Sequence, residues 1–239
     1  MRTIFNTRFN LPYEDVIDPR IPLITDSLLA GYDCLTNLDF SGRGNNFSYG
    51  GGFNNQGAIL ANNAAHVIQT PVIEQDEMTV IGCWNIAAPN AAASLVNNMD
   101  VSDPLAFRGN RIIRLDTNVG QIDVATGIAN PTLTSMPTGV AGAWTIRAWS
   151  WNNSTLREIF HSGAIANTRT LSDGRAKNIA RGFSVNGVPA GVPGGSITAG
   201  TDGTLGFMLF YNEFIDPAVA KSRMDIVADI MLRRGVVVP

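Results

Sequence analysis

Apolar and β-branched runs alternate with turn-rich segments along most of this sequence. Residues 78–86 (MTVIGCWNI) are apolar at both odd and even positions, which is typical of a strand buried on both faces. The segments between runs are too short to contain helices, so the pattern predicts an all-β sandwich of antiparallel strands. We expect the other strands within residues 27–34, 57–63, 66–72, 110–117, 120–126, 142–151, 155–163, 182–190 and 204–212.

Residues 217–234 have a helical pattern. Asp216 is suited to cap the N-terminus, and Pro217 fits the first helical position, where its missing N–H costs nothing. Gly235 suits the left-handed conformation that often ends a helix. Apolar residues fall on one stripe and charged residues on another, which predicts a helix packed against the sandwich. The apolar stripe comprises Ala220, Met224, Val227 and Met231.

Residues 1–27 differ from the rest because Pro12, Pro19 and Pro22 interrupt them. Each proline biases the preceding residue towards an extended conformation, so we expect an extended N-terminal arm followed by one sandwich domain at residues 28–239. An ordered arm must be held by its own domain or by a neighbouring molecule. The side chains that we expect to contact a partner are Phe5, Phe9, Leu11, Tyr13 and Ile17.

Composition narrows the classes of partner. Hydrophobic residues make up 45% of the 239 residues and charged residues 15%, with a net charge of −3, so one large core is expected. Lys and Arg form no runs, which argues against nucleic acid as a partner. No segment resembles a signal peptide or a membrane helix, so we expect synthesis in a cytoplasm and no membrane insertion. Cys34 and Cys83 are expected to be buried thiols rather than a disulfide.

Several motifs occur in an order found in one superfamily. LLAGYD at residues 28–33 leads to the loop DFSGRGNN at 39–46, and MTVIGCW follows at 78–84. GFMLFYNEFIDPAVAKSRMDIV at residues 206–227 combines a strand, an aromatic pair, a polar turn and a helix. This order resembles the concanavalin A-like lectin/glucanase superfamily, in particular the laminin G-like domains of bacteriophage structural proteins. Residues 87–140 do not align with that family.

The resemblance implies a concanavalin A-like jelly-roll β-sandwich and a non-enzymatic virion protein made in the host cytoplasm. Such a protein would be a capsid decoration or a tail-associated module, attached to other virion proteins through its N-terminal arm. A homo-oligomer is also implied, with a trimer favoured. The alternative is a lectin-like adhesin that binds host-surface polysaccharide, and a glycoside hydrolase is the least favoured reading.

Glucanases of this superfamily carry carboxylates at alternate positions of one strand, about 5 Å apart for a retaining mechanism. Glu74 and Asp76 have this spacing, but Met78 and Thr79 stand where a third carboxylate would be needed. Glu77 would point to the other face. A charged loop before the next strand is the simpler interpretation, so we expect no hydrolase.

Glycan binding would need an aromatic face for stacking and amides for hydrogen bonds. Trp149 and Trp151 share one face of a predicted strand, and Asn152 and Asn153 follow them. If that face points outwards, the four residues form a glycan-binding platform. If it points inwards, the tryptophans belong to the core, which is the default for this residue type.

No cofactor is expected, and calcium is the one metal with a candidate site. Asp116, Asn118 and Asp123 offer oxygen ligands at suitable positions but lack the bidentate glutamate and the spacing of an EF-hand loop. A hairpin turn stabilised by these side chains is therefore favoured over a calcium site. His66 and His161 adjoin no G-x-S-x-G motif, and their spacing does not suggest zinc.

Overall fold

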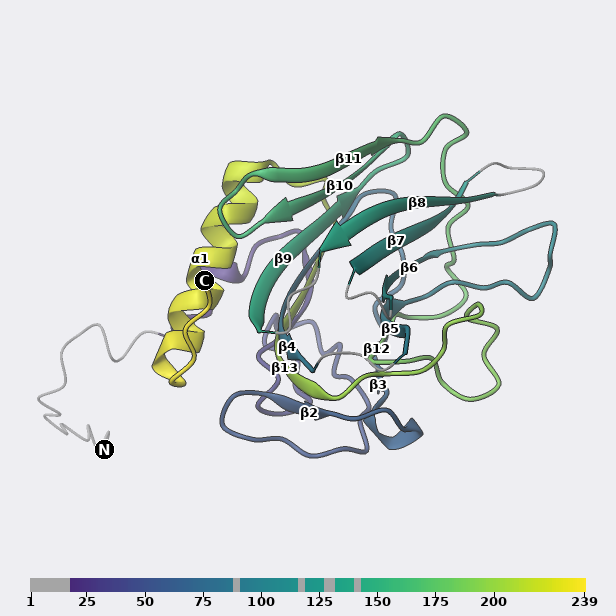
Figure 1. Ribbon diagram of the computed structural model, residues 1–239. Helices are drawn as coiled ribbons and strands as arrows, with labels where there is room; N and C mark the ends of the chain where they lie inside the picture. The colour runs from purple at the N-terminus through teal and green to yellow at the C-terminus, as the bar shows by residue number, and fades with distance from the viewer. Residues whose placement is uncertain (1–17, 88–90, 116–118, 127–131, 140–142) are drawn as a thin grey trace, which may run out of the picture.

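The structure, a computed structural model, describes residues 18–87, 91–115, 119–126, 132–139 and 143–239. Two antiparallel sheets pack face to face, and one helix, α1 (Pro217–Arg233), covers the outside of one sheet (Figure 1). The prediction of an all-β, antiparallel jelly-roll sandwich with a C-terminal helix is thus confirmed. Within these described ranges, no helix is long and apolar enough to cross a membrane.

The first sheet has seven strands in the order β1-β13-β4-β9-β10-β11, and β2 pairs with β13 beside this path. Its central strand, β4, is buried along nearly its whole length, as its doubly apolar pattern predicts. The strands of this seven-stranded sheet are β1 (Leu28–Tyr32), β2 (Ala58–Leu60), β4 (Met78–Ile86), β9 (Trp144–Trp151), β10 (Thr155–Phe160), β11 (Ile165–Thr170) and β13 (Gly203–Tyr211).

The second sheet has six strands in the order β3-β12-β5-β6-β7-β8. They are β3 (Ile68–Gln69), β5 (Ala93–Asn97), β6 (Asn110–Arg114), β7 (Val119–Thr126), β8 (Thr132–Gly139) and β12 (Ser184–Val185). Strands β5, β8 and β11 were not predicted from the sequence. They lie in polar or alanine-rich segments whose hydrophobic alternation is weak.

The main core lies between the two sheets. Trp84, Trp149 and Trp151 project into it from the seven-stranded sheet, and Ile112 and Ile122 project from the six-stranded sheet. The rings of Trp84 and Trp149 stack with centroids 5.2 Å apart. Alternate residues of β4 and β9 point into this core, and the residues between them point to the other face of the sheet.

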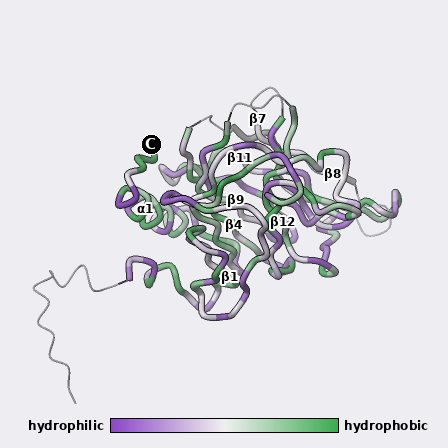
Figure 2. Tube along the Cα trace, turned by 90° about the horizontal axis from the view of Figure 1, so that it is seen from below, coloured by the Kyte–Doolittle hydropathy of each residue, from purple (hydrophilic) through white to green (hydrophobic). Residues whose placement is uncertain are grey.

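A second core lies between the seven-stranded sheet and α1. Phe207 and Leu209 of β13 face the helix residues Met224, Val227 and Met231, all fully buried. Asp216 caps the helix by accepting a hydrogen bond from the Ala218 backbone N–H, as predicted. The hydropathy colouring in Figure 2 alternates along α1, as expected for a helix with one covered side.

Residues 18–27, predicted to belong to the arm, lie against the sandwich itself. Leu23, in the short 3-10 helix η2 (Ile21–Leu23), is fully buried in the second core. The Tyr211 hydroxyl donates a hydrogen bond of 3.1 Å to the Leu23 carbonyl, and Arg20 pairs with Asp33 at 2.6 Å. The five predicted partner-contacting side chains, Phe5, Phe9, Leu11, Tyr13 and Ile17, lie outside the described residues.

Cys34 and Cys83 are both buried and unbridged, consistent with their interpretation as buried thiols. Burial raises the pKa of each thiol above its ordinary value, so both stay protonated at neutral pH. Neither cysteine has the exposed, electropositive surroundings that make a thiol reactive.

Candidate functional site

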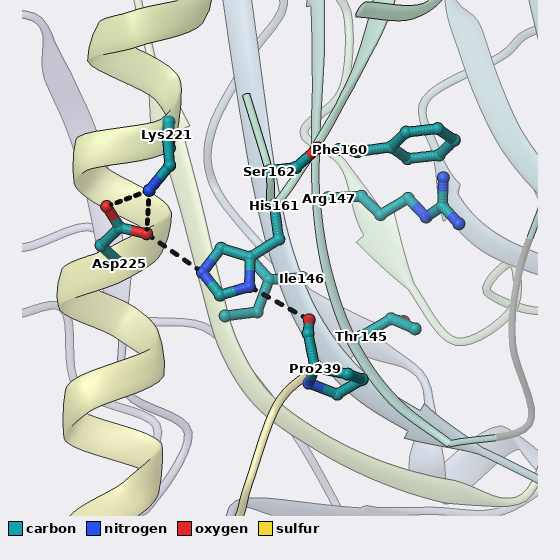
Figure 3. A pocket seen from close by; sticks show the side chains of 9 residues that line it. All are labelled: Thr145, Ile146, Arg147, Phe160, His161, Ser162, Lys221, Asp225 and Pro239. Carbon is teal, nitrogen blue, oxygen red and sulfur yellow. Dashed lines mark hydrogen bonds and ion pairs between the residues drawn. The ribbon is translucent and has the colours of Figure 1, made fainter. Parts of the chain in front are cut away.

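A groove lies between α1 and the β9–β10 part of the seven-stranded sheet, and we call it the α1 groove (Figure 3). Its volume is about 450 Å³, within the range of roughly 300 to 1,000 Å³ that is usual for ligand sites. Its lining residues are Thr145, Ile146, Arg147, Phe160, His161, Ser162, Lys221, Asp225 and Pro239.

The helix side of the α1 groove is held by His161, in the turn after β10. Its Nε2 lies 3.3 Å from the Asp225 carboxylate, and its Nδ1 lies 3.2 Å from the Pro239 carbonyl oxygen. Both ring nitrogens therefore lie near acceptor oxygens. Lys221 also pairs with Asp225, at 2.7 Å, one helical turn away. Asp225 is thus shared between His161 and Lys221.

Arg147 on β9 and Phe160 on β10 belong to the strands that border the α1 groove, but their side chains point to the other face of the sheet, away from α1 (Figure 3). Arg147 Nη1 donates a 3.0 Å hydrogen bond to Glu158, which has no exposed side-chain surface. Burial raises the pKa of Glu158, while Arg147 and Asn167 lower it by smaller amounts. The Arg147 guanidinium also lies 4.3 Å from the ring centroid of Phe160, a cation–π distance. Phe160 itself is 37% exposed, so part of its ring borders solvent.

This arrangement favours binding over catalysis. Asp225, the carboxylate among the lining residues of the α1 groove, is engaged in ion pairs with His161 and Lys221. The buried Glu158, on the other face of the sheet, pairs with Arg147. General acid–base work needs a titratable group within reach of a substrate proton. On the other face of the sheet, the partly exposed ring of Phe160 beside the Arg147 guanidinium instead suits a polar ligand with an apolar face.

The tryptophans proposed as a glycan platform lie elsewhere. Trp149 and Trp151 share one face of β9, as predicted, but that face points into the main core and leaves them 0% and 1% exposed. A ring without exposed surface cannot stack on a sugar. The platform hypothesis is therefore wrong for these two residues, and the alternative interpretation as core residues is correct.

Asn152 and Asn153 form the turn between β9 and β10 rather than a ligand site. The Asn152 side-chain oxygen accepts hydrogen bonds from the backbone N–H groups of Ser154 and Thr155. The Asn153 oxygen accepts one from the Arg175 N–H, at 3.2 Å. These oxygens close the turn, as expected of asparagine at such positions.

The acidic segment before β4 contains no catalytic pair. Glu74 is 2% exposed and accepts hydrogen bonds from Asn98, Asn110 and the Asn178 backbone N–H. Arg175 also lies 3.2 Å from it, so this carboxylate is fully engaged in joining separate segments. Asp76 is on the surface and pairs with Lys177, while Glu77 is exposed. The segment precedes β4 and is not a strand, so alternate positions do not share a face.

The calcium candidate is only partly described, because Asp116 and Asn118 lie outside the described residues. Asp123 is 1% exposed on β7, where it pairs with Arg111 at 2.8 Å and accepts a hydrogen bond from Ser135. Its oxygens are thus already used by protein donors. Among the residues with described positions, no group of three or more His, Cys, Asp or Glu side chains is arranged to hold a metal ion.

Sequence reasoning missed the α1 groove. Phe160 and Arg147 are ordinary strand residues by pattern, and His161 was considered only as a catalytic base or a zinc ligand. The groove closes between segments roughly 60 to 90 residues apart, and no local spacing signals that contact. The sole usable signal was the polar side of α1, which carries Lys221 and Asp225 at i and i+4.

The fold and the groove together define a β-sandwich protein with a surface groove beside its C-terminal helix. No family model matches the sequence, and neither does any curated protein. Among solved structures, the fold is similar to the receptor-binding domain of botulinum neurotoxin type G, with a TM-score of 0.65 and 11% identity over 85% of this chain and 52% of that one.

It is also similar to the binding domain of Paraclostridial Mosquitocidal Protein 1, with a TM-score of 0.64, 13% identity and coverage of 83% and 52%. A third similar structure carries the description "Cell entry of botulinum neurotoxin type C is dependent upon interaction with two ganglioside molecules", with a TM-score of 0.63, 9% identity and coverage of 87% and 53%. The chain spans about half the length of each of these proteins. At such identities the likeness shows the fold alone.

Proposed function

We propose that this chain is a non-enzymatic binding module that recognises a saccharide unit of a cell-surface glycan at the ring of Phe160. One observation carries the proposal: Phe160 is 37% exposed, and its ring lies 4.3 Å from the guanidinium of Arg147, whose charge is balanced by Glu158. Sugars present an apolar ring face for stacking and hydroxyls for hydrogen bonds, and both needs are met there. The receptor-binding and ganglioside-dependent roles named for the similar structures support this ligand class.

A glycan array followed by calorimetric titration tests the proposal. Phe160→Ala should weaken binding of the selected glycan by about fivefold or more, because aromatic contacts contribute roughly 0.5 to 1.5 kcal/mol beyond the buried area. Phe53→Ala is the matched control, since Phe53 is also 37% exposed and does not line the groove. Failure of the wild-type protein to retain any glycan, or equal affinity of Phe160→Ala, would refute the saccharide proposal.

We further propose that residues 1–17 attach this module to a bacteriophage particle, as a capsid decoration or a tail-associated protein. The support is the sequence resemblance to laminin G-like domains of phage structural proteins and the proline-interrupted N-terminal segment. Residues 18–27 already pack on their own sandwich, which leaves the preceding residues for contact with other virion proteins. A trimeric assembly follows from the same resemblance.

Deletion of residues 1–17 tests the attachment without disturbing the contacts of Leu23 and Arg20. The truncated protein should keep its thermal stability and lose association with particles in a sedimentation assay. Light scattering of the full chain should give about three chain masses. Normal particle binding by the truncated protein would contradict the role of residues 1–17, while leaving the glycan proposal untouched.

A further inference from the structure

The outer face of the six-stranded sheet carries a row of polar side chains that crosses every strand. The strand registers place each member directly opposite the next. We call it the polar row, and in sheet order its members are Gln69, Ser184, Asn97, Arg111, Asp123 and Ser135.

The middle of the polar row is covered and internally balanced. Arg111 pairs with Asp123 at 2.8 Å, and Asp123 accepts a second hydrogen bond from Ser135. Residues 187–196 form a loop over it, and the Asn97 amide donates a 3.0 Å hydrogen bond to the Gly194 carbonyl. A Cβ on Gly195 would lie 2.4 Å from the Arg111 guanidinium, so the loop sits directly on this side chain. This part of the row is structural.

The β3–β12 end of the polar row is different because it opens into a pocket. The pocket has a volume of about 140 Å³ and lies between these strands and the loop of residues 187–196. It is lined by Gln69, Thr70, Arg181, Gly182, Phe183, Ser184, Pro189 and Val192.

Arg181 brings an unbalanced positive charge to this pocket. Its Nη2 donates to the Asn97 side-chain oxygen at 2.9 Å and to the Met99 carbonyl at 2.7 Å, and both acceptors are neutral. Within the described part of the chain, no carboxylate lies within 4.0 Å of its nitrogens, and its Nε is buried without a hydrogen-bond partner. The nearest acid that influences it is Asp100, which raises its pKa by less than burial lowers it. A half-buried guanidinium is normally paired with an anion.

We propose that this pocket is an anion subsite that takes one carboxylate group of a ligand, with Arg181 as its electrostatic anchor. Because both Nη2 hydrogens are engaged and Nε is buried, Nη1 is the donor left to bind a carboxylate oxygen through a charge-assisted hydrogen bond. The exposed amide of Gln69 supplies a further donor at the rim. The volume is below the roughly 300 Å³ of a complete ligand site, so the pocket holds a single acidic group while the rest of the ligand lies outside.

The carboxylate could be free or borne by an acidic sugar, and the test separates these sources. Isotope-labelled protein is titrated with acetate, glucuronate and glucose while backbone amide NMR signals are followed. Acetate and glucuronate should shift the signals of residues 181–184 and 190–192, and glucose should not. Equal affinities for the two acids would mean that only the carboxylate is recognised, whereas tighter binding of glucuronate would add a sugar contact.

Arg181→Gln should weaken binding of both acids at least tenfold, because charge-assisted hydrogen bonds are lost. Arg233→Gln is the control, since Arg233 is exposed at the end of α1 and its loss changes the net charge equally. Arg181 also holds Asn97 and Met99, so Val192→Asp provides a second variant that keeps those bonds and places a competing carboxylate in the pocket.

Both pocket variants should lose the acid-dependent shifts, and Arg233→Gln should keep them. Absence of these shifts in the wild-type protein would overturn the anion subsite, as would shifts that persist in Arg181→Gln and Val192→Asp or an equal response to glucose. The pocket and the α1 groove lie on different sheets, so the result is independent of Phe160 and of the glycan proposal.

Discussion

The two outer faces of the sandwich are covered in opposite ways. On the seven-stranded sheet, α1 places Met224 and Val227 over Phe207 and Leu209, and this contact is mainly apolar. On the six-stranded sheet, a loop rich in glycine and proline at residues 187–196 covers the charged and amide side chains of the polar row.

The difference shows how each cover relates to function. An apolar contact is non-directional and gains stability from the area removed from water. A polar contact must match every donor to an acceptor, and here the match is incomplete: Arg111 Nη1 and Arg181 Nε are buried without partners. Incomplete matching leaves donors that a ligand can satisfy, whereas the α1 groove lies at the margin of the apolar contact.

The largest expected effect comes from breaking the apolar cover. Phe207→Ala should lower the free energy of unfolding by about 4 kcal/mol, because it removes a fully buried ring beneath α1 and leaves a cavity. Val219→Ala, on the exposed side of α1, should cost less than about 0.5 kcal/mol. Urea denaturation measures both variants, and similar losses in the two would mean that α1 is not a stabilising cover.

The second largest loss of stability should come from breaking the Arg111–Asp123 ion pair of the polar row, and a second substitution should restore most of it. Asp123→Ala leaves the buried Arg111 guanidinium without its anion, and we expect a loss of about 3 kcal/mol. The double variant Arg111→Met with Asp123→Leu should recover most of this loss, because it removes both buried charges. If the double variant is as unstable as the single one, the ion pair is not the origin of the cost.

A smaller effect depends on pH and concerns Glu158, the partner of Arg147. Burial raises its pKa above the ordinary value of 4.5, so its contribution to stability is present at low pH and declines as the pH rises through the raised value. The free energy of unfolding of the wild-type protein, taken relative to Glu158→Gln, should therefore fall as the pH increases from 4.5 towards neutrality. A difference that stays constant or grows with pH would show that Arg147 compensates the burial fully.

The smallest effect should come from the contact of residues 18–27 with the sandwich. The side-chain hydrogen bond from Arg20 lowers the pKa of Asp18, so this pair stabilises the fold above pH 3.8, and the contribution is lost as the pH falls below that value. Asp18 is 40% exposed, and screening should keep the loss in Asp18→Asn below about 1 kcal/mol at pH 7. The loss of melting temperature in Asp18→Asn, relative to the wild-type protein, should be larger at pH 7 than at pH 2. For the exposed control Asp229→Asn, the difference from the wild type should be the same at both pH values.

The elements that could be predicted from the sequence are those with a strong hydrophobic pattern of their own. Strand β4 and helix α1 were predicted because their hydrophobic periods and caps are encoded within each segment. Strand β11 is polar and largely exposed at a sheet edge, and β8 is an edge strand that contains Pro137. Such strands are specified by the neighbour they pair with, which no window of sequence reveals.

The sites were harder to predict for a related reason. The shared face of Trp149 and Trp151 follows from alternation, but whether that face points inwards depends on how the two sheets stack. The contact of His161 with Asp225 and the exposure of Arg181 beside Gln69 arise from packing between distant segments. Only the three-dimensional arrangement brings these side chains together.

Pro239 lines the α1 groove, and the first described residues pack beside α1. Both therefore lie on the helix side of the sandwich (Figure 1). A surface or fusion partner joined at either position would therefore crowd the groove and leave the Arg181 pocket facing free solvent. Immobilised protein should consequently report acid binding faithfully, and the ring of Phe160, which points away from α1, should stay accessible to a glycan as well.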